Sequence, residues 1–185
     1  GMVCHETYKD ENNNWVNPEE IISRNGKKYL KDNILKELKV GPSESMSKSK
    51  KNTVDPENII NDYGADSVRL FILSDSPPEK DVQWSEEGIV ASHKFIQKLW
   101  TLNSKIIEEI NKDHHKDKDI EFTKFTNKFI KKISNNLENF SYNVIVANLH
   151  EMHSFLIKKI VKGYQKKTIL ENYKKILITI NPVLP

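Results

Sequence analysis

The chain has 185 residues, of which 37% are hydrophobic and 30% charged, a size that suits one ordinary domain or two small ones. Its longest apolar runs fall well short of the ~20 residues of a membrane span, which excludes a membrane protein of that kind. A single cysteine, Cys4, excludes an intrachain disulfide and a cysteine-rich zinc site, and it favours a reducing, cytoplasmic compartment.

The net charge of +3 is unevenly distributed along the chain. Residues 1–91 contain 12 Lys and Arg against 17 Asp and Glu, a balance of −5, whereas residues 92–185 contain 17 Lys against 9 Asp and Glu, a balance of +8. An acidic half joined to a lysine-rich half predicts two regions with different partners.

The first 53 residues favour short extended pieces and turns. Residues 10–14 predict one turn, and Asn25-Gly26 predicts a second turn with a hairpin arm after it. Residues 41–53 predict a loop, because Gly41-Pro42 interrupts any preceding element and five of the 13 residues are Ser or Thr.

Helix signals begin in the middle of the chain. Asp55-Pro56-Glu57 predicts a helix start, and Gly64 predicts its end with a left-handed cap. Residues 65–73 fit helix or strand equally well by periodicity. Ser85 predicts the N-cap of a further helix. Trp84 and Trp100 flank the junction of the two halves, and we expect both to be packing anchors.

The last hundred residues carry four apolar stripes at three- and four-residue steps, which predict a bundle of four amphipathic helices. Residues 113–119 predict a charged connector, and the paired histidines within it are expected to be solvated rather than to bind a metal. The stripes are Phe95, Leu99, Leu102, Ile106 and Ile110; Phe122, Phe125, Phe129, Ile133 and Leu137; Ile145, Leu149, Met152, Leu156 and Ile160; and Ile169, Tyr173, Ile176 and Ile180.

Residues 45–52, Ser-Met-Ser-Lys-Ser-Lys-Lys-Asn, have the composition of a polyphosphate-binding loop. Lysine ammonium groups can follow a phosphate as it moves, and serine hydroxyls can donate to it. By composition a solvated basic loop is the commoner explanation for such a segment. The order of the residues, however, resembles the "KMSKS" signature of class I aminoacyl-tRNA synthetases, and the spacing of Asp55-Pro56, Tyr63-Gly64-Ala65-Asp66 and Arg69-Leu70-Phe71 fits that family too.

Within that class, Met-Ser-Lys-Ser-Lys-x-Asn and the segment from Ser76-Pro77-Pro78 to Trp84-Ser85 are most similar to bacterial and organellar leucyl-tRNA synthetases. The resemblance implies an enzyme that joins leucine to ATP, taken with Mg²⁺, and then transfers leucine to tRNA(Leu). It implies that Lys48 is catalytic, through stabilisation of charge on the departing pyrophosphate. The ATP-binding residues that it implies are Ser45, Met46, Ser47, Lys48 and Ser49.

One residue departs from the signature: Ser45 stands where the family has its first lysine, which removes a positive charge from the loop. Lys50 or Lys51 are candidates to compensate, and both are also candidates for contact with tRNA. A further lysine cluster, which the resemblance favours as a contact for the tRNA backbone over a solvated face, comprises Lys158, Lys159, Lys162, Lys166 and Lys167.

The resemblance divides the chain into three regions. It implies the end of a catalytic α/β domain over 1–54, a connecting region over 55–90 that contacts the tRNA stem, and a helical anticodon-binding-type domain over 91–185. The fold class expected is therefore mainly α, with a small α/β part. The family's "HIGH" motif is missing and the chain ends on apolar residues, so we expect a fragment of a larger monomeric enzyme that is inactive by itself.

Two other interpretations remain. The chain could be a diverged tRNA-binding module without catalysis, which the replacement of the signature lysine by Ser45 allows. An unrelated structural helical bundle would leave the order of residues 46–85 unexplained. No residue set predicts a metal site, because His150 and His153 have helical spacing but no third ligand.

Overall fold

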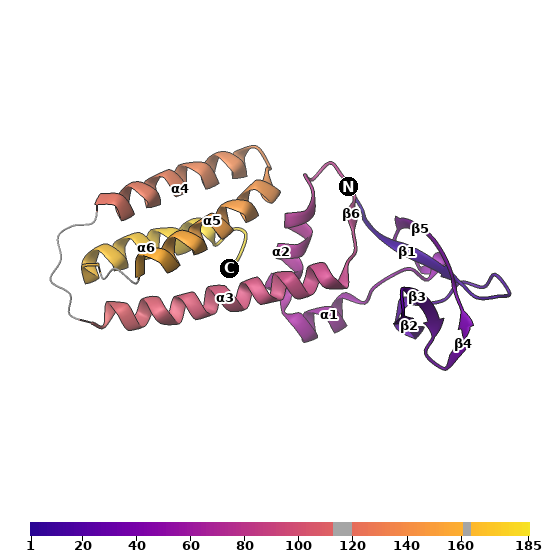
Figure 1. The fold of residues 1–185 in the computed structure, drawn as a ribbon. Coiled ribbons are helices and arrows are strands. Elements are labelled where there is room, and N and C mark those ends of the chain that lie inside the picture. The colour runs from indigo at the N-terminus through magenta and orange to yellow at the C-terminus, as the bar shows by residue number, and fades with distance from the viewer. Residues whose placement is uncertain (113–119, 161–163) are drawn as a thin grey trace.

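The computed structural model covers the whole chain and describes residues 1–112, 120–160 and 164–185. The predicted connector at 113–119, with its histidines, lies outside the described residues. Short strands gather at one end of the molecule, and long helices extend away from them (Figure 1). The predicted fold class, mainly α with a small part that contains strands, is confirmed.

The first sheet is built around β1 (Val3–Lys9). β5 (Lys39–Ser45) pairs with it antiparallel on one side, and the short β6 (Val82–Gln83) pairs parallel on the other. The loop predicted for 41–53 is therefore wrong for its first five residues, which belong to β5. Composition alone missed the strand because its pairing partner lies more than 30 residues away in sequence.

Two residues of β5 that suggested a loop fit an edge strand. Pro42 lacks a backbone donor, a loss that an edge strand tolerates. Gly41 lies opposite Thr7, where an added β-carbon would come within 2.4 Å of the threonine hydroxyl oxygen. Glycine here allows the two strands to approach closely.

The second sheet is an antiparallel meander of β2 (Ile21–Arg24), β3 (Lys27–Leu30) and β4 (Asn33–Glu37). The predicted turn at Asn25-Gly26 joins β2 to β3, and both of its residues have positive φ angles. The earlier predicted turn is organised by Asp10, whose carboxylate accepts two backbone N–H groups. Both turn predictions are confirmed.

Two short helices follow, α1 (Pro56–Tyr63) and α2 (Ala65–Asp75). The Asp55 side chain caps α1 by accepting the N–H of Glu57 at 2.9 Å, as predicted. Gly64 ends α1 with a φ of 82°, but its ψ of 150° is not that of the predicted left-handed cap. α2 begins at the next residue, and the stretch after Gly64 that was ambiguous by periodicity is helical.

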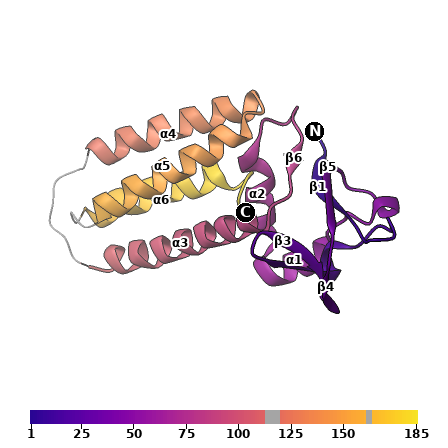
Figure 2. The ribbon, with the colours of Figure 1, turned by 45° about the vertical axis from the view of Figure 1, so that its right-hand side comes forward.

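In the described part of the chain, four longer helices follow: α3 (Glu86–Ile110), α4 (Ile120–Glu138), α5 (Tyr142–Ile160) and α6 (Lys166–Ile180). They form the predicted bundle and lie side by side in both views (Figures 1 and 2). The hydroxyl of Ser85 accepts the backbone N–H three residues later, which confirms it as the N-cap of α3.

The bundle core is formed by the predicted stripes together with Leu70 of α2, Val146, Tyr164 and Val183. Trp84 is an anchor as expected, because its ring packs edge-on against Phe71 at 5.4 Å between centroids. Trp100 is not, since it is 69% exposed on a face of α3 beside the core stripe. The buried core residues of the four stripes are Phe95, Leu102, Ile106, Phe122, Phe129, Ile133, Ile145, Leu149, Met152, Leu156, Ile169, Ile176 and Ile180.

The segment that leads from α2 to α3 ties the first sheet to the helices. Val82 donates its backbone N–H to the carbonyl of Met2 at 2.9 Å, and Trp84 donates to that of Cys4 at 2.7 Å. The orientation of β1 and β5 relative to the bundle therefore depends on this short strand. In the described part of the chain, no helix has both the length and the apolar character needed to cross a membrane.

Candidate functional site

The loop at residues 45–52 begins where β5 ends and folds into one turn of 3-10 helix, Lys48–Lys50. Met46 is tied to β1 by a hydrogen bond from its N–H to the carbonyl of Val3 at 3.2 Å. Ser47 caps the turn, with its hydroxyl accepting the N–H of Lys50 at 3.4 Å and lying 3.3 Å from the hydroxyl of Ser49. Serine and lysine side chains are therefore displayed on a turn whose backbone is anchored to the sheet.

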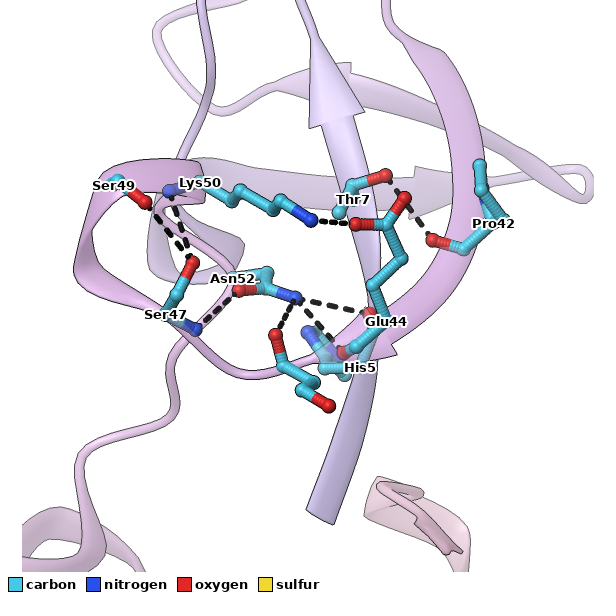
Figure 3. A network of polar contacts seen from close by, with 9 residues as sticks. His5, Thr7, Pro42, Glu44, Ser47, Ser49, Lys50 and Asn52 are labelled. Carbon is cyan, nitrogen blue, oxygen red and sulfur yellow. Dashed lines mark hydrogen bonds and ion pairs between the residues drawn. The ribbon is translucent and has the colours of Figure 1, made fainter. Parts of the chain in front are cut away.

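Asn52 closes the loop from inside (Figure 3). Its side chain is fully buried, which is unusual for asparagine and requires hydrogen-bond partners. The Oδ1 atom accepts the N–H of Ser47 at 2.8 Å, and Nδ2 donates to the carbonyls of His5 and Glu44, each at 3.2 Å. A third carbonyl, that of Ser45, lies at 3.5 Å.

The lysines of the loop differ in their surroundings. Lys50 forms an ion pair with Glu44 of β5, so its charge is largely balanced within the loop (Figure 3). Both side chains of that pair are more than one third exposed, and such surface pairs contribute only about 0–1 kcal/mol. Lys51 is exposed and has left-handed backbone angles at the end of the turn.

Lys48 is the first residue of the turn, and its side chain is exposed. It makes no ion pair or side-chain hydrogen bond with the residues that the structure describes. Its ammonium is thus available to an external anion, whereas that of Lys50 already has a carboxylate beside it. Ser45, where the family has a lysine, is also exposed and adds no charge.

A polar cavity of about 680 Å³ lies elsewhere on this end of the molecule, between the two sheets and the start of α3. Glu6, Glu86 and Glu87 line it and make it unfavourable for phosphates. Burial lowers the pKa of the His5 imidazole below 6.5, and it raises the pKa of Tyr8, whose hydroxyl donates to Glu6 at 2.8 Å. The exposed side of the loop is therefore the better place for a polyphosphate.

The second predicted site lies at the other end of the molecule, where α5 ends and α6 begins (Figures 1 and 2). Lys158 and Lys166 are exposed there, and neither side chain makes an ion pair with a described residue. Lys162 lies outside the described residues.

Two lysines of this second cluster have acidic neighbours. Lys159 pairs with Glu121 of α4, and Lys167 lies 3.8 Å from Glu171. The structure therefore brings four of the five predicted lysines to one end of the bundle, but it does not bring Lys50 and Lys51 near them.

Sequence reasoning missed the roles of two residues that shape the loop. Glu44, the β5 residue that pairs with the loop, was not singled out, although its place six residues before Lys50 could have suggested a local ion pair. Asn52 was read as part of the motif, and its role as the buried centre of the loop depends on contacts with β1 that no local pattern reveals. No group of three or more His, Cys, Asp or Glu side chains able to hold a metal occurs among the described residues.

Comparison with known proteins gives matches that include the residues of this loop. The family model of class I tRNA synthetases for isoleucine, leucine, methionine and valine ("I, L, M and V") matches residues 40–85, which include the loop and both short helices. A leucine–tRNA ligase of Wolbachia pipientis from Culex pipiens is 40% identical over 194 aligned residues that cover the whole chain. The whole chain matches one section of the leucyl-tRNA synthetases.

Other leucyl-tRNA synthetases agree over the same span. The leucine–tRNA ligases of Bartonella tribocorum and Rickettsia massiliae are each 37% identical across the full chain. The chain spans 22% of the length of each of these relatives. The resemblance predicted from the sequence is thus confirmed, from the first residue of the chain to the last.

A solved structure supports the fold. The crystal structure of Agrobacterium radiobacter K84 agnB2 LeuRS in a ternary complex with tRNA and LeuAMS matches 76% of this chain and 19% of its own, with a TM-score of 0.65. Sequence identity over the match is 22%, so it shows a shared arrangement of elements.

Proposed function

We propose that this chain is part of a leucine–tRNA ligase, which forms leucyl-adenylate and pyrophosphate from leucine and ATP and then transfers leucine to tRNA(Leu). The observation that carries the proposal is the similarity to leucine–tRNA ligases across all of the chain, including a loop with an exposed lysine that no described carboxylate pairs. The activity is assigned to the whole enzyme, of which this chain supplies one section.

In this proposal the loop binds the ATP phosphates, which arrive with Mg²⁺. Lys48 stabilises the negative charge that develops on pyrophosphate as its bond to the α-phosphate breaks. A positioned charge of this kind contributes roughly 10²–10³ in rate. Ser47 and Ser49 donate hydroxyl hydrogen bonds, and Ser45 and Met46 complete the phosphate-facing segment.

The replacement of the signature's first lysine by Ser45 makes the reaction depend more heavily on Lys48. Lys50 is a poor substitute, because Glu44 balances its charge. Lys51 is exposed and can add to the field of the loop at longer range. This distribution supports a single principal cation at the phosphates.

The helical part is proposed to contact the tRNA. The charge of +8 over residues 92–185 and the exposed Lys158 and Lys166 suit the phosphate backbone, which is bound without readout of base sequence. Lys159 and Lys167 add to this surface, and Lys50 and Lys51 are candidates for contacts near the acceptor end. Lys162, which lies outside the described residues, stays a candidate from the sequence alone. We place the enzyme in the cytoplasm as a monomer.

The test of the function is amino-acid-dependent exchange of pyrophosphate into ATP by the full-length enzyme. We expect exchange with leucine to exceed exchange with isoleucine and valine by orders of magnitude, followed by charging of tRNA(Leu). A full-length protein that binds this tRNA but exchanges pyrophosphate with none of the three amino acids would instead support the non-catalytic binding module.

A further inference from the structure

We infer that Asn52 is a positioning residue for adenylate formation, which acts by holding the turn that carries Lys48. The inference rests on the proposed function of the loop and adds to it the residue that fixes the loop's geometry. Asn52 itself is fully buried below the turn, out of reach of solvent.

The first step is that one carboxamide joins three segments. Asn52 accepts a hydrogen bond from Ser47, the cap of the turn, and donates to the carbonyls of His5 in β1 and Glu44 in β5 (Figure 3). Because the Asn52 carboxamide is fully buried, water cannot take the place of these hydrogen bonds when they are lost. The start of the turn is thereby fixed to both strands.

The second step is that Asn52 also follows directly on the end of the turn. Lys51 closes it by donating its N–H to the carbonyl of Lys48 at 3.3 Å, with a φ of 51°. A left-handed backbone at a residue other than glycine is unfavourable unless its surroundings hold it. The buried Asn52 side chain, one residue later, supplies that hold.

The third step is that Lys48 has no anchor of its own among the described residues. The position of its ammonium is therefore set by the backbone of the turn. Two local bonds across the turn would remain, from Lys50 N–H to the hydroxyl of Ser47 at 3.4 Å and from Lys51 N–H to the carbonyl of Lys48 at 3.3 Å, and both are long. Removal of the Asn52 carboxamide should leave the charge of Lys48 in the loop, but the backbone that positions this charge should become mobile.

A released lysine still attracts phosphates, yet it is less often placed where charge develops in the transition state. Rate enhancement by fixed charges depends on that placement. Loss of Asn52 should therefore lower kcat of leucine-dependent pyrophosphate exchange while the KM for leucine stays near its normal value.

The experiment uses the full-length enzyme with Asn52→Ala and with the isosteric Asn52→Asp, which keeps an acceptor for Ser47 but places a carboxylate against three carbonyl oxygens. We expect kcat to fall by roughly ten- to a hundredfold, which corresponds to the loss of a buried hydrogen-bonded group. Asn61→Ala replaces an exposed asparagine of α1 and serves as the matched control, which should leave kcat unchanged.

Coupling to Lys48 separates a positioning role from a general structural one. In a Lys48→Ala background, Asn52→Asp should lower the remaining rate by less than about threefold, because the group that it positions is gone. A second readout is recovery at low pH. Protonation of the new aspartic acid restores a donor, so the rate of Asn52→Asp relative to wild type should rise between pH 8 and pH 6.

The outcomes are distinguishable. Wild-type exchange by Lys48→Ala would overturn the proposed role of the loop and this inference with it. A slow Lys48→Ala enzyme beside wild-type Asn52 variants would overturn the inference alone, as would an Asn52→Asp effect of equal size in both backgrounds. If Asn52→Ala does not fold, Asn52→Asp carries the same test.

Discussion

The lysines where α5 meets α6 make a quantitative prediction for tRNA binding. Lys158 and Lys166 are exposed, and their charges are not balanced by a described carboxylate, whereas Lys159 and Lys167 have acidic neighbours. The double variant Lys158→Ala/Lys166→Ala should therefore remove two full phosphate contacts. Each contact contributes about 0.9 to the slope of log K against log salt on a double helix and about 0.7 on a single strand.

We expect the slope for tRNA(Leu) to become less steep by about 1.4–1.8. Equilibrium binding of the full-length enzyme between about 50 and 200 mM salt, a range over which the Debye length falls by about half, measures it. Lys31→Ala/Lys39→Ala removes the same charge from exposed positions among the strands and serves as the control. An unchanged slope for the first pair, or an equal change for both pairs, would refute the assignment of this end of the bundle to the tRNA backbone.

Two further predictions concern the bundle. Leu149 is fully buried in its core, so Leu149→Ala should lower the free energy of unfolding by about 2–5 kcal/mol in urea denaturation, whereas Val144→Ala, at a site 43% exposed, should change it by less than about 0.5 kcal/mol. Burial and the nearby Lys98 lower the pKa of His153 below 6.5. The unfolded chain then binds more protons than the folded one as pH falls through 6.5 and below, so the melting temperature should drop between pH 7.5 and 5.5, and less steeply in His153→Gln.

Much of the helical architecture could be predicted from the sequence because its causes are local. The four stripes follow the helical period, and Asp55 and Ser85 cap the helices that they precede. Asn25-Gly26 adopts the positive φ angles that a tight hairpin needs. In each case the information lies within a few residues of the element that it determines.

The features that could not be predicted from the sequence depend on contacts between distant parts of the chain. Residues 41–45 have a loop composition, and they form a strand only because β1 offers a partner. Trp100 is one residue away from the core stripe, and its large apolar ring suggested burial that the packing of α3 does not provide. The basic loop was recognised from its order of residues, but its internal division into a paired Lys50 and a free Lys48 required the position of Glu44.

The central claim is that one unpaired lysine in this loop supplies the charge that drives adenylate formation. It is tested most directly by leucine-dependent pyrophosphate exchange in the full-length enzyme with Lys48→Ala, compared with Lys39→Ala at the exposed start of β5. We predict that Lys48→Ala lowers kcat by roughly 10²–10³ with leucine binding unchanged and that Lys39→Ala stays at the wild-type rate. Exchange by Lys48→Ala within about threefold of wild type would contradict the claim, because the loop would then hold no catalytic charge at this position.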